Sequence, residues 1–216
     1  MRSKWLLAAA GFFAAGAAHA EVLFSIPYDP TSFAGNMSYT SVSDPTLYLH
    51  GYEAFSIGSA ATVQSVDFVG LFYPADSSIS SFTIGIFSNS GGQPGAAIAT
   101  QTYPGDGGPT PVPGAPASDL GAYAYALELG PTSLAAGTYW LSIYAATDQT
   151  WYWGESLTGP ETGLTTTGAG FQLTNSDFTF TLYGSAVPEP AAWTMMILGL
   201  AAAGAALRRR PRVVTD

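Results

Sequence analysis

Apolar and polar residues alternate with a period of two along most of residues 61–183, and this alternation constrains the fold more than any other feature. In residues 81–88, for example, Phe82, Ile84 and Ile86 fall on one side of the chain. Successive side chains of a strand point to opposite faces, so the pattern predicts half-buried β-strands. Residues 21–186 contain no apolar period of 3.6 that is long enough to predict a helix. We therefore expect an all-β domain.

The expected strands are separated by turns rich in glycine and proline. They cover residues 22–26, 61–73, 81–88, 96–102, 122–129, 138–146, 149–153 and 178–183, with short edge strands at 37–39 and 47–49. Residues 89–95 predict a hairpin turn, and Gly130-Pro131 is expected to end the strand before it. Within residues 61–73, Val66, Phe68 and Phe72 should share one face and Val63 the other. Many strands without crossover helices predict an antiparallel β-sandwich, specifically a jelly roll.

The charges are divided between the middle of the chain and its ends. All six Lys and Arg residues lie in the two terminal segments, whereas residues 21–186 hold thirteen of the fifteen acidic residues. A domain of this kind cannot neutralise phosphates, so nucleic acid is excluded as a partner. Anionic lipid headgroups should also repel it. The chain has no cysteine, which excludes disulfides, thiol catalysis and cysteine-ligated metal centres.

Residues 1–20 predict a secretory signal peptide. Arg2 and Lys4 precede an apolar run, and Ala18-His19-Ala20 fits the A-x-A cleavage site. The run is shorter than the roughly 20 residues that cross a bilayer comfortably. We expect signal peptidase to cleave after Ala20, so that the exported domain comprises residues 21–186.

A second apolar run, Ala191 to Leu207, lies near the C-terminus and is followed by four arginines in residues 208–212. As a helix it would be about 25 Å long, which is adequate for a bacterial inner membrane. The arginines would hold its far end in the cytoplasm. We expect a single transmembrane helix at residues 191–207, with the domain on the periplasmic side.

Residues 187–216 resemble the PEP-CTERM sorting signal. The matching parts are the tripeptide Pro188-Glu189-Pro190, the apolar run and the basic cluster Arg208, Arg209 and Arg210. Trp193, three residues after the tripeptide, resembles the PEPxxW subgroup. The two prolines hold the tripeptide extended, as a membrane-bound protease requires.

The resemblance implies a fate for the protein. Such signals are typical of Gram-negative bacteria that make exopolysaccharide. They are processed near the tripeptide by an exosortase, a membrane-embedded enzyme similar to a cysteine transpeptidase. The protein is then released to the cell surface or the extracellular matrix. Two further segments, 82–95 and 134–141, resemble jelly-roll domains of bacterial surface proteins, which implies a fold more than an activity.

Aromatic residues are the candidates for ligand binding by the domain. Trp140, Trp151, Tyr152 and Trp153 would form a glycan-binding surface if their ring faces were exposed, because sugars stack on such faces. The alternative is that these rings pack in the core, where aromatics bury large areas. We expect no cofactor, although loop carboxylates could bind a structural Ca²⁺. The candidate ligands are Asp106, Asp119, Asp148, Glu155 and Glu161, without an EF-hand spacing.

Catalysis has little support in the sequence. His50 is the one histidine of residues 21–186, and no nucleophile elbow accompanies it. We therefore expect an exported, non-enzymatic surface or matrix protein, with exopolysaccharide as a candidate partner. The two carboxylates of a glycosidase cannot be recognised by spacing along the chain. A secreted carbohydrate-active enzyme on a jelly-roll scaffold is the alternative.

Overall fold

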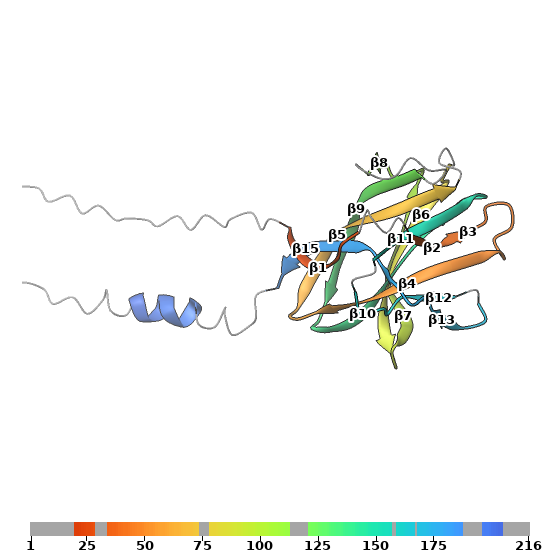
Figure 1. The fold of residues 1–216 in the computed structure, drawn as a ribbon. Coiled ribbons are helices and arrows are strands. Elements are labelled where there is room, and N and C mark those ends of the chain that lie inside the picture. Colours follow the sequence, from red (N-terminus) through yellow and green to blue (C-terminus); the bar gives the residue numbers. More distant parts are fainter. Residues whose placement is uncertain are drawn as a thin grey trace, which may run out of the picture.

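The computed structural model describes residues 20–28, 34–73, 78–112, 121–156, 159–166, 168–187 and 196–204. These residues form fifteen strands and one short helix (Figure 1). The strands are β1 (Glu21–Ile26), β2 (Gly35–Met37), β3 (Tyr39–Thr40), β4 (Tyr48–Ile57), β5 (Ala61–Tyr73), β6 (Ser81–Ser90), β7 (Gln93–Pro104), β8 (Thr110–Pro111), β9 (Gly121–Leu134), β10 (Gly137–Ala146), β11 (Thr150–Ser156), β12 (Leu164–Thr166), β13 (Phe171–Leu173), β14 (Asp177–Phe178) and β15 (Phe180–Ala186).

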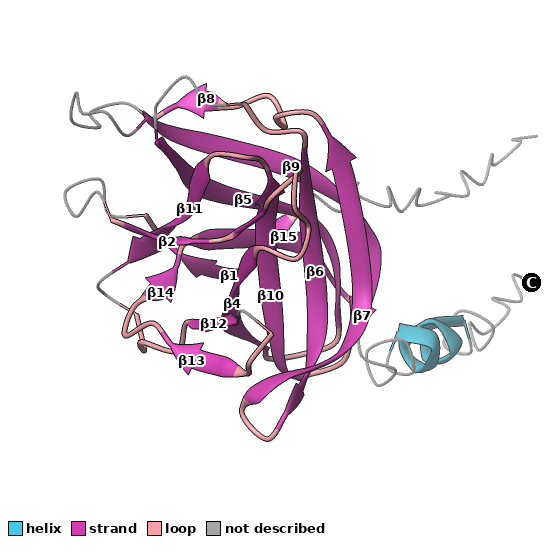
Figure 2. Cartoon of the chain, turned by 90° about the vertical axis from the view of Figure 1, so that its right-hand side faces the viewer, coloured by secondary structure: helices cyan, strands magenta, loops and turns pink. Residues whose placement is uncertain are grey.

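The strands assemble into two sheets, as expected for a sandwich (Figure 2). The first sheet has the order β1-β15-β5-β11-β14, with β9 also on β5, β8 on β9 and β2 on β11. The second has the order β13-β12-β4-β3-β10-β6-β7, and β4 also pairs with β10. Every described pairing is antiparallel except the short one between β3 and β10. The architecture is a mostly antiparallel, two-sheet β-structure.

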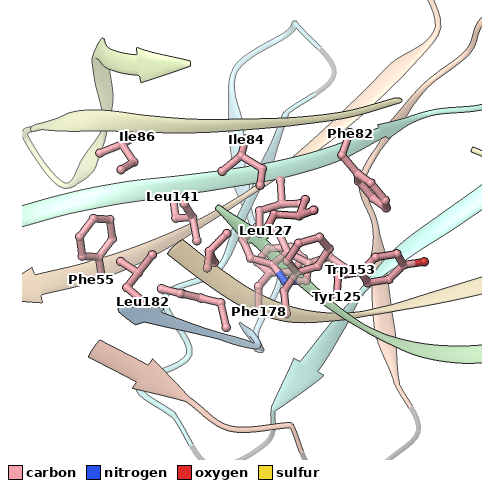
Figure 3. Packing of buried hydrophobic residues seen from close by; sticks show 14 of the residues in the cluster. Phe55, Phe82, Ile84, Ile86, Tyr125, Leu127, Leu141, Trp153, Phe178 and Leu182 are labelled. Atoms are coloured by element: carbon pink, nitrogen blue, oxygen red, sulfur yellow. The ribbon is translucent and has the colours of Figure 1, made fainter. Parts of the chain in front are cut away.

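The inner faces of the sheets enclose one apolar core (Figure 3). The predicted inward residues of β6 are buried, as are Phe178, Phe180 and Leu182 at the end of the domain. Aromatic rings fill much of the space between the sheets, where they pack in tilted and edge-to-face pairs. The period-two pattern therefore predicted the core-facing sides of these strands correctly.

Strand β5 matches its predicted bounds but departs from simple alternation. Val66, Phe68 and Phe72 face the core as predicted, yet Val63 is buried with them. Against β15, strand β5 has one extra residue, because Tyr183 pairs with Ser65 and the next residue, Gly184, pairs with Val63. A β-bulge adds a residue to one strand and so changes which face the preceding side chains occupy. The prediction that Val63 lies on the opposite face was wrong for this reason.

Two other sequence expectations were wrong. Strand β9 does not end at Gly130-Pro131 but continues to Leu134. The two residues lie between Glu128 and Thr132, where the pairing with β5 is interrupted, and the pairing resumes at Thr132. Proline is tolerated in a strand at such a position, where no ladder hydrogen bond is lost. The ten-residue strand β4 was predicted only at its first two residues, although it pairs with β10 in the middle of the second sheet.

The described part of the C-terminal segment is a helix over residues 196–204. No helix within the described residues is long and apolar enough to cross a membrane. The predicted span of residues 191–207 extends beyond the described helix on both sides. The signal peptide, apart from its last residue, also lies outside the described residues.

Candidate functional site

The three tryptophans proposed for sugar stacking are buried. Trp151 and Trp153 are fully enclosed, and Trp140 is 4% exposed. Trp153 stacks on Phe178 with ring centroids 4.6 Å apart and donates its indole N–H to the Thr179 carbonyl at 2.8 Å. Rings without an exposed face cannot stack on a sugar. Trp151 and Trp153 belong to the core between the sheets, whereas Trp140 packs with Tyr52 and Leu164 in a second, smaller apolar cluster. Tyr152, which is half-buried, points to the opposite side of β11.

His50 is packed between aromatic rings. Its imidazole stacks on Tyr144 with centroids 3.7 Å apart, and its Nε2 is hydrogen-bonded to the Thr40 hydroxyl at 2.8 Å. Burial lowers the pKa of His50 to about 4, so the ring is neutral at neutral pH. These contacts account for His50 as a structural residue of the second sheet.

The loop carboxylates considered for Ca²⁺ are not gathered at one place. Asp148 accepts hydrogen bonds from the Ser41 hydroxyl and the Ser43 amide, whereas Asp106 accepts one from the Gly108 amide. Asp119 lies outside the described residues. Within the described ranges, no group of three or more histidine or acidic side chains could hold a metal ion.

The structure brings together two acidic residues that the sequence did not single out, Glu53 and Asp177. Both are fully buried. The Thr162 hydroxyl donates to Glu53 Oε1 at 2.6 Å and lies 3.5 Å from Asp177 Oδ1. We call Glu53, Asp177 and Thr162 the carboxylate bracket, because they join β4, β14 and the segment before β12.

Backbone amides supply the other hydrogen bonds of the bracket. The Phe178 amide donates to Glu53 Oε2 at 2.7 Å, and the Glu161 and Thr162 amides donate to Asp177 at 3.0 and 2.8 Å. Glu161 has a positive φ of 58°, a conformation that is uncommon for residues other than glycine. The bracket therefore holds residues 161–162 in a strained turn against the sandwich.

The electrostatics of the bracket follow from its burial in a domain that has no Lys or Arg in residues 21–186. Burial raises the pKa of Glu53 to about 7, and the nearby Asp177 raises it further, while the hydrogen bonds oppose the shift. Burial also raises the pKa of Glu155, which accepts a hydrogen bond from Asn36. Asn36 in turn donates to the Ser176 hydroxyl at 3.1 Å.

The bracket is closed to substrate. The carboxylates of a glycosidase flank the sugar at the scissile bond, whereas Glu53 and Asp177 are enclosed and bonded to the protein itself. Close packing also fills the space around them. A Cβ atom at Gly159 would lie 1.9 Å from Asp177 Oδ2, and one at Gly163 would lie 2.3 Å from the Ser176 carbonyl oxygen. The enclosed and hydrogen-bonded carboxylates of the bracket therefore suit a structural role.

An open groove of about 280 Å³ lies on the outer side of the first sheet. Thr181, Asp67 and Ala126 form a cross-strand row on its floor, since Asp67 pairs with both of the others. Tyr28 after β1 and Thr110 in β8 contribute to its walls. Hydroxyl groups, one carboxylate and small apolar side chains can together hydrogen-bond and contact a polar, uncharged chain. We call this surface the outer groove.

The sorting segment leaves the domain at one end of the sandwich, where β1 and β15 lie side by side (Figure 1). Glu21 Oε1 accepts a hydrogen bond from the Ala186 amide at 3.0 Å. The Val187 amide donates to the Ala60 carbonyl at 2.8 Å. The tripeptide that begins at Pro188 therefore follows directly on the last hydrogen-bonded residue of the domain. Pro188, Glu189, Pro190, Trp193 and the arginines lie outside the described residues.

Comparison with solved structures gives a distant likeness. The chain is similar to a crystal structure of the cysteine protease and lectin-like domains of Cwp84, a surface layer associated protein of Clostridium difficile. The sequences are 9% identical, the TM-score is 0.45, and the match covers 64% of this chain. It covers 32% of the other chain, so the present chain spans about a third of that protein's length. No curated protein matches the chain.

Comparison with protein families gives a match confined to the end of the chain. Residues 186–210 match the PEP-CTERM protein-sorting motif. The match begins at the last residue of β15 and confirms the resemblance of the tripeptide, the apolar run and the arginines. The chain thus carries a PEP-CTERM protein-sorting motif, which implies an exported, cell-surface-sorted protein that an exosortase processes.

Proposed function

We propose that the protein is a non-enzymatic component of the cell surface or extracellular matrix, built on a jelly-roll domain. Signal peptidase releases residues 21–186 and the following segment into the periplasm, and a helix at residues 191–207 holds the precursor in the inner membrane. Exosortase then processes the precursor near Pro188-Glu189-Pro190. The match of residues 186–210 to the sorting motif is the observation that carries this proposal.

The test is the mass of the exported protein. We expect the surface form to begin at Glu21 and to lack the arginines at its C-terminus. Replacing Pro188, Glu189 and Pro190 by alanine should retain the precursor in the membrane fraction, because the residues that define the motif are gone. As a control, alanine replacement of exposed Leu47, which is far from the motif in the sequence, should leave processing unchanged. Recovery of a surface form that is intact through Asp216 would exclude exosortase processing.

Within this function, the outer groove is our candidate for binding exopolysaccharide. Its polar floor suits sugar hydroxyl groups, and residues 21–186 have no Lys or Arg to attract an anionic polymer. An uncharged polysaccharide is therefore the favoured ligand. Replacing Asp67 by alanine should weaken retention of the secreted protein in a gel containing the strain's own exopolysaccharide. The matched replacement of exposed Glu128, which does not line the groove, should not.

The alternative is a carbohydrate-active enzyme. A hydrolase needs two carboxyl groups on opposite sides of a sugar, and Asp67 is the one acidic residue among the described residues that line the outer groove. This arrangement favours binding over hydrolysis. If the secreted protein released reducing sugar from exopolysaccharide, and the Asp67→Asn protein did not, the enzymatic alternative would replace our proposal.

A further inference from the structure

We propose that the end of the sandwich from which the sorting segment emerges is a docking surface for the exosortase, so that the enzyme contacts the folded domain as well as the motif. We call this end the base and define it by residues 21–23, 56–62, 133–138 and 184–187. The inference rests on the proposed function. It adds that recognition includes the domain.

The sequence places no linker between the folded domain and the sorting motif. The amide of Val187 is still bonded to Ala60, and the tripeptide begins at the next residue. Consecutive Cα atoms are 3.8 Å apart, so Glu189 lies within about 8 Å of Val187 along the chain. An enzyme that encloses the tripeptide must therefore contact the base, unless the end of β15 first separates from β1 and β5.

The distribution of charge also distinguishes the base from the opposite end. Glu21 is the one charged residue of the base, and its carboxylate is bonded to the Ala186 amide. Among the described residues, three exposed acidic residues lie on loops at the opposite end, namely Asp44, Asp106 and Asp148, and exposed Glu128 and Glu161 lie outside the base, on β9 and before β12. An inner membrane carries anionic headgroups that repel carboxylates. The base, with its single carboxylate, therefore meets less electrostatic repulsion than the opposite end when it approaches a membrane-embedded enzyme.

The base is also hollowed and partly apolar. A hollow of about 280 Å³ opens there, lined by Val22, Leu23 and Ile57, by small residues at the β4–β5 turn and the end of β15, and by Glu21. Val22 is 59% exposed, and Val187, at the exit of the sorting segment, is 44% exposed. Exposed aliphatic side chains around a hollow favour contact with an apolar side chain of a partner. The partner that must reach this place is the processing enzyme.

The experiment compares two equally exposed positions, one at each end of the sandwich, and adds a second position at the base. Val22→Glu places a charge at the base, and Leu47→Glu places one at the opposite end, where the side chain is 60% exposed. Ser59→Glu is a second base variant, on the exposed turn. We expect the base variants to slow processing about tenfold in cells, because a charge desolvated at an interface opposes association. The Leu47→Glu protein should be processed like the wild type, and the thermal unfolding midpoints should agree.

A linker variant tests whether contact with the base matters. Ten Gly and Ser residues inserted between Val187 and Pro188 should slow processing of the wild-type domain and should remove the difference between Val22→Glu and Leu47→Glu. Faster processing with the linker would mean that the base only obstructs the enzyme, and this would overturn the inference. So would equal processing of Val22→Glu and Leu47→Glu without the linker.

Two further results separate the inference from its alternatives. If the wild-type chain is recovered intact, the proposed function fails before the base is tested. If the secreted mature protein binds phosphatidylglycerol vesicles and Val22→Glu abolishes this binding, the base is a lipid contact and the docking inference is wrong. We expect no vesicle binding by either protein.

Discussion

The domain contains two buried regions that are held together by different forces. The aromatic core between the sheets is apolar, and its rings pack against one another, as Trp153 does on Phe178. The carboxylate bracket is polar, and hydrogen bonds to Glu53 and Asp177 define it. Burial of apolar surface is non-directional and tolerates small shifts. The bracket instead depends on the position and protonation of individual atoms.

This difference predicts how each region responds to change. The core should lose stability in proportion to the volume removed and should be insensitive to pH. The stability that the bracket contributes should depend on pH. Substitutions in the bracket should loosen residues 159–163 and leave the rest of the domain unchanged. The predictions below test the comparison in order of expected effect.

The largest effect is expected in the core. Trp153→Ala should lower the free energy of unfolding by about 3–5 kcal/mol, because it removes a fully buried ring and leaves a cavity. Urea unfolding of the mature protein measures this loss. Tyr152→Ala, at the neighbouring half-buried position, is the control and should lose less. Equal losses at the two positions would show that the core is not the main source of stability.

The pH dependence of stability should identify Glu53. Its pKa is raised from 4.5 to about 7 on folding, so folding favours the protonated form. The stabilisation is complete below pH 4.5 and is lost as the pH rises through 7, with a total on the order of 3 kcal/mol. Glu53→Gln cannot ionise and should flatten the decline in unfolding midpoint between pH 5 and pH 8. An unchanged slope, matching that of the exposed control Glu128→Gln, would show that Glu53 does not titrate in this range.

Asp177 should have a smaller and more local effect. Asp177→Ala leaves the Glu161 and Thr162 amides without their acceptor and should cost about 1–3 kcal/mol. Hydrogen exchange should quicken in residues 159–163 and stay slow in β5 and β10. Uniformly faster exchange would mean that the bracket supports the whole sandwich, against the comparison above.

The smallest loss of stability is expected when the hydrogen bond of the Trp140 ring is removed. The Trp140 indole N–H donates to the Asn89 side chain at 3.1 Å. Asn89→Ala removes this acceptor and should cost about 1 kcal/mol, since one part-buried hydrogen bond is lost. The unfolding midpoint in urea measures it. A loss as large as that of Trp153→Ala would contradict the distinction between the two kinds of contact.

The two regions also differ in how well the sequence predicted them. Alternation along β6 and β15 predicted which side chains enter the core, because strand periodicity is a local property. The sorting motif was identified for the same reason, since its parts are contiguous in the chain. The bulge that buries Val63 and the interruption beside Pro131 depend on the partner strand, which the pattern along one strand does not contain.

The bracket could not be found in this way. Glu53 and Asp177 are far apart in the chain, and each looks like an ordinary surface carboxylate in its local sequence. Only the pairing of β4 with β12 and of β11 with β14 brings them to the same turn. For the tryptophans the sequence suggested a site that the structure does not contain. Their residue type suggested a surface for sugars, and only the tertiary structure shows that they are enclosed.

The pairing of β1 with β15 has a consequence for the order in which the chain folds. The first strand of the exported domain finds its in-sheet neighbour only in the last strand, more than 150 residues later. Such long-range pairings form late and slowly, because the loop must be closed before the contacts compensate for its entropy. The sandwich can be completed only after nearly the whole domain has been translocated. Closure of the first sheet therefore has to wait for β15, the strand that directly precedes the sorting segment.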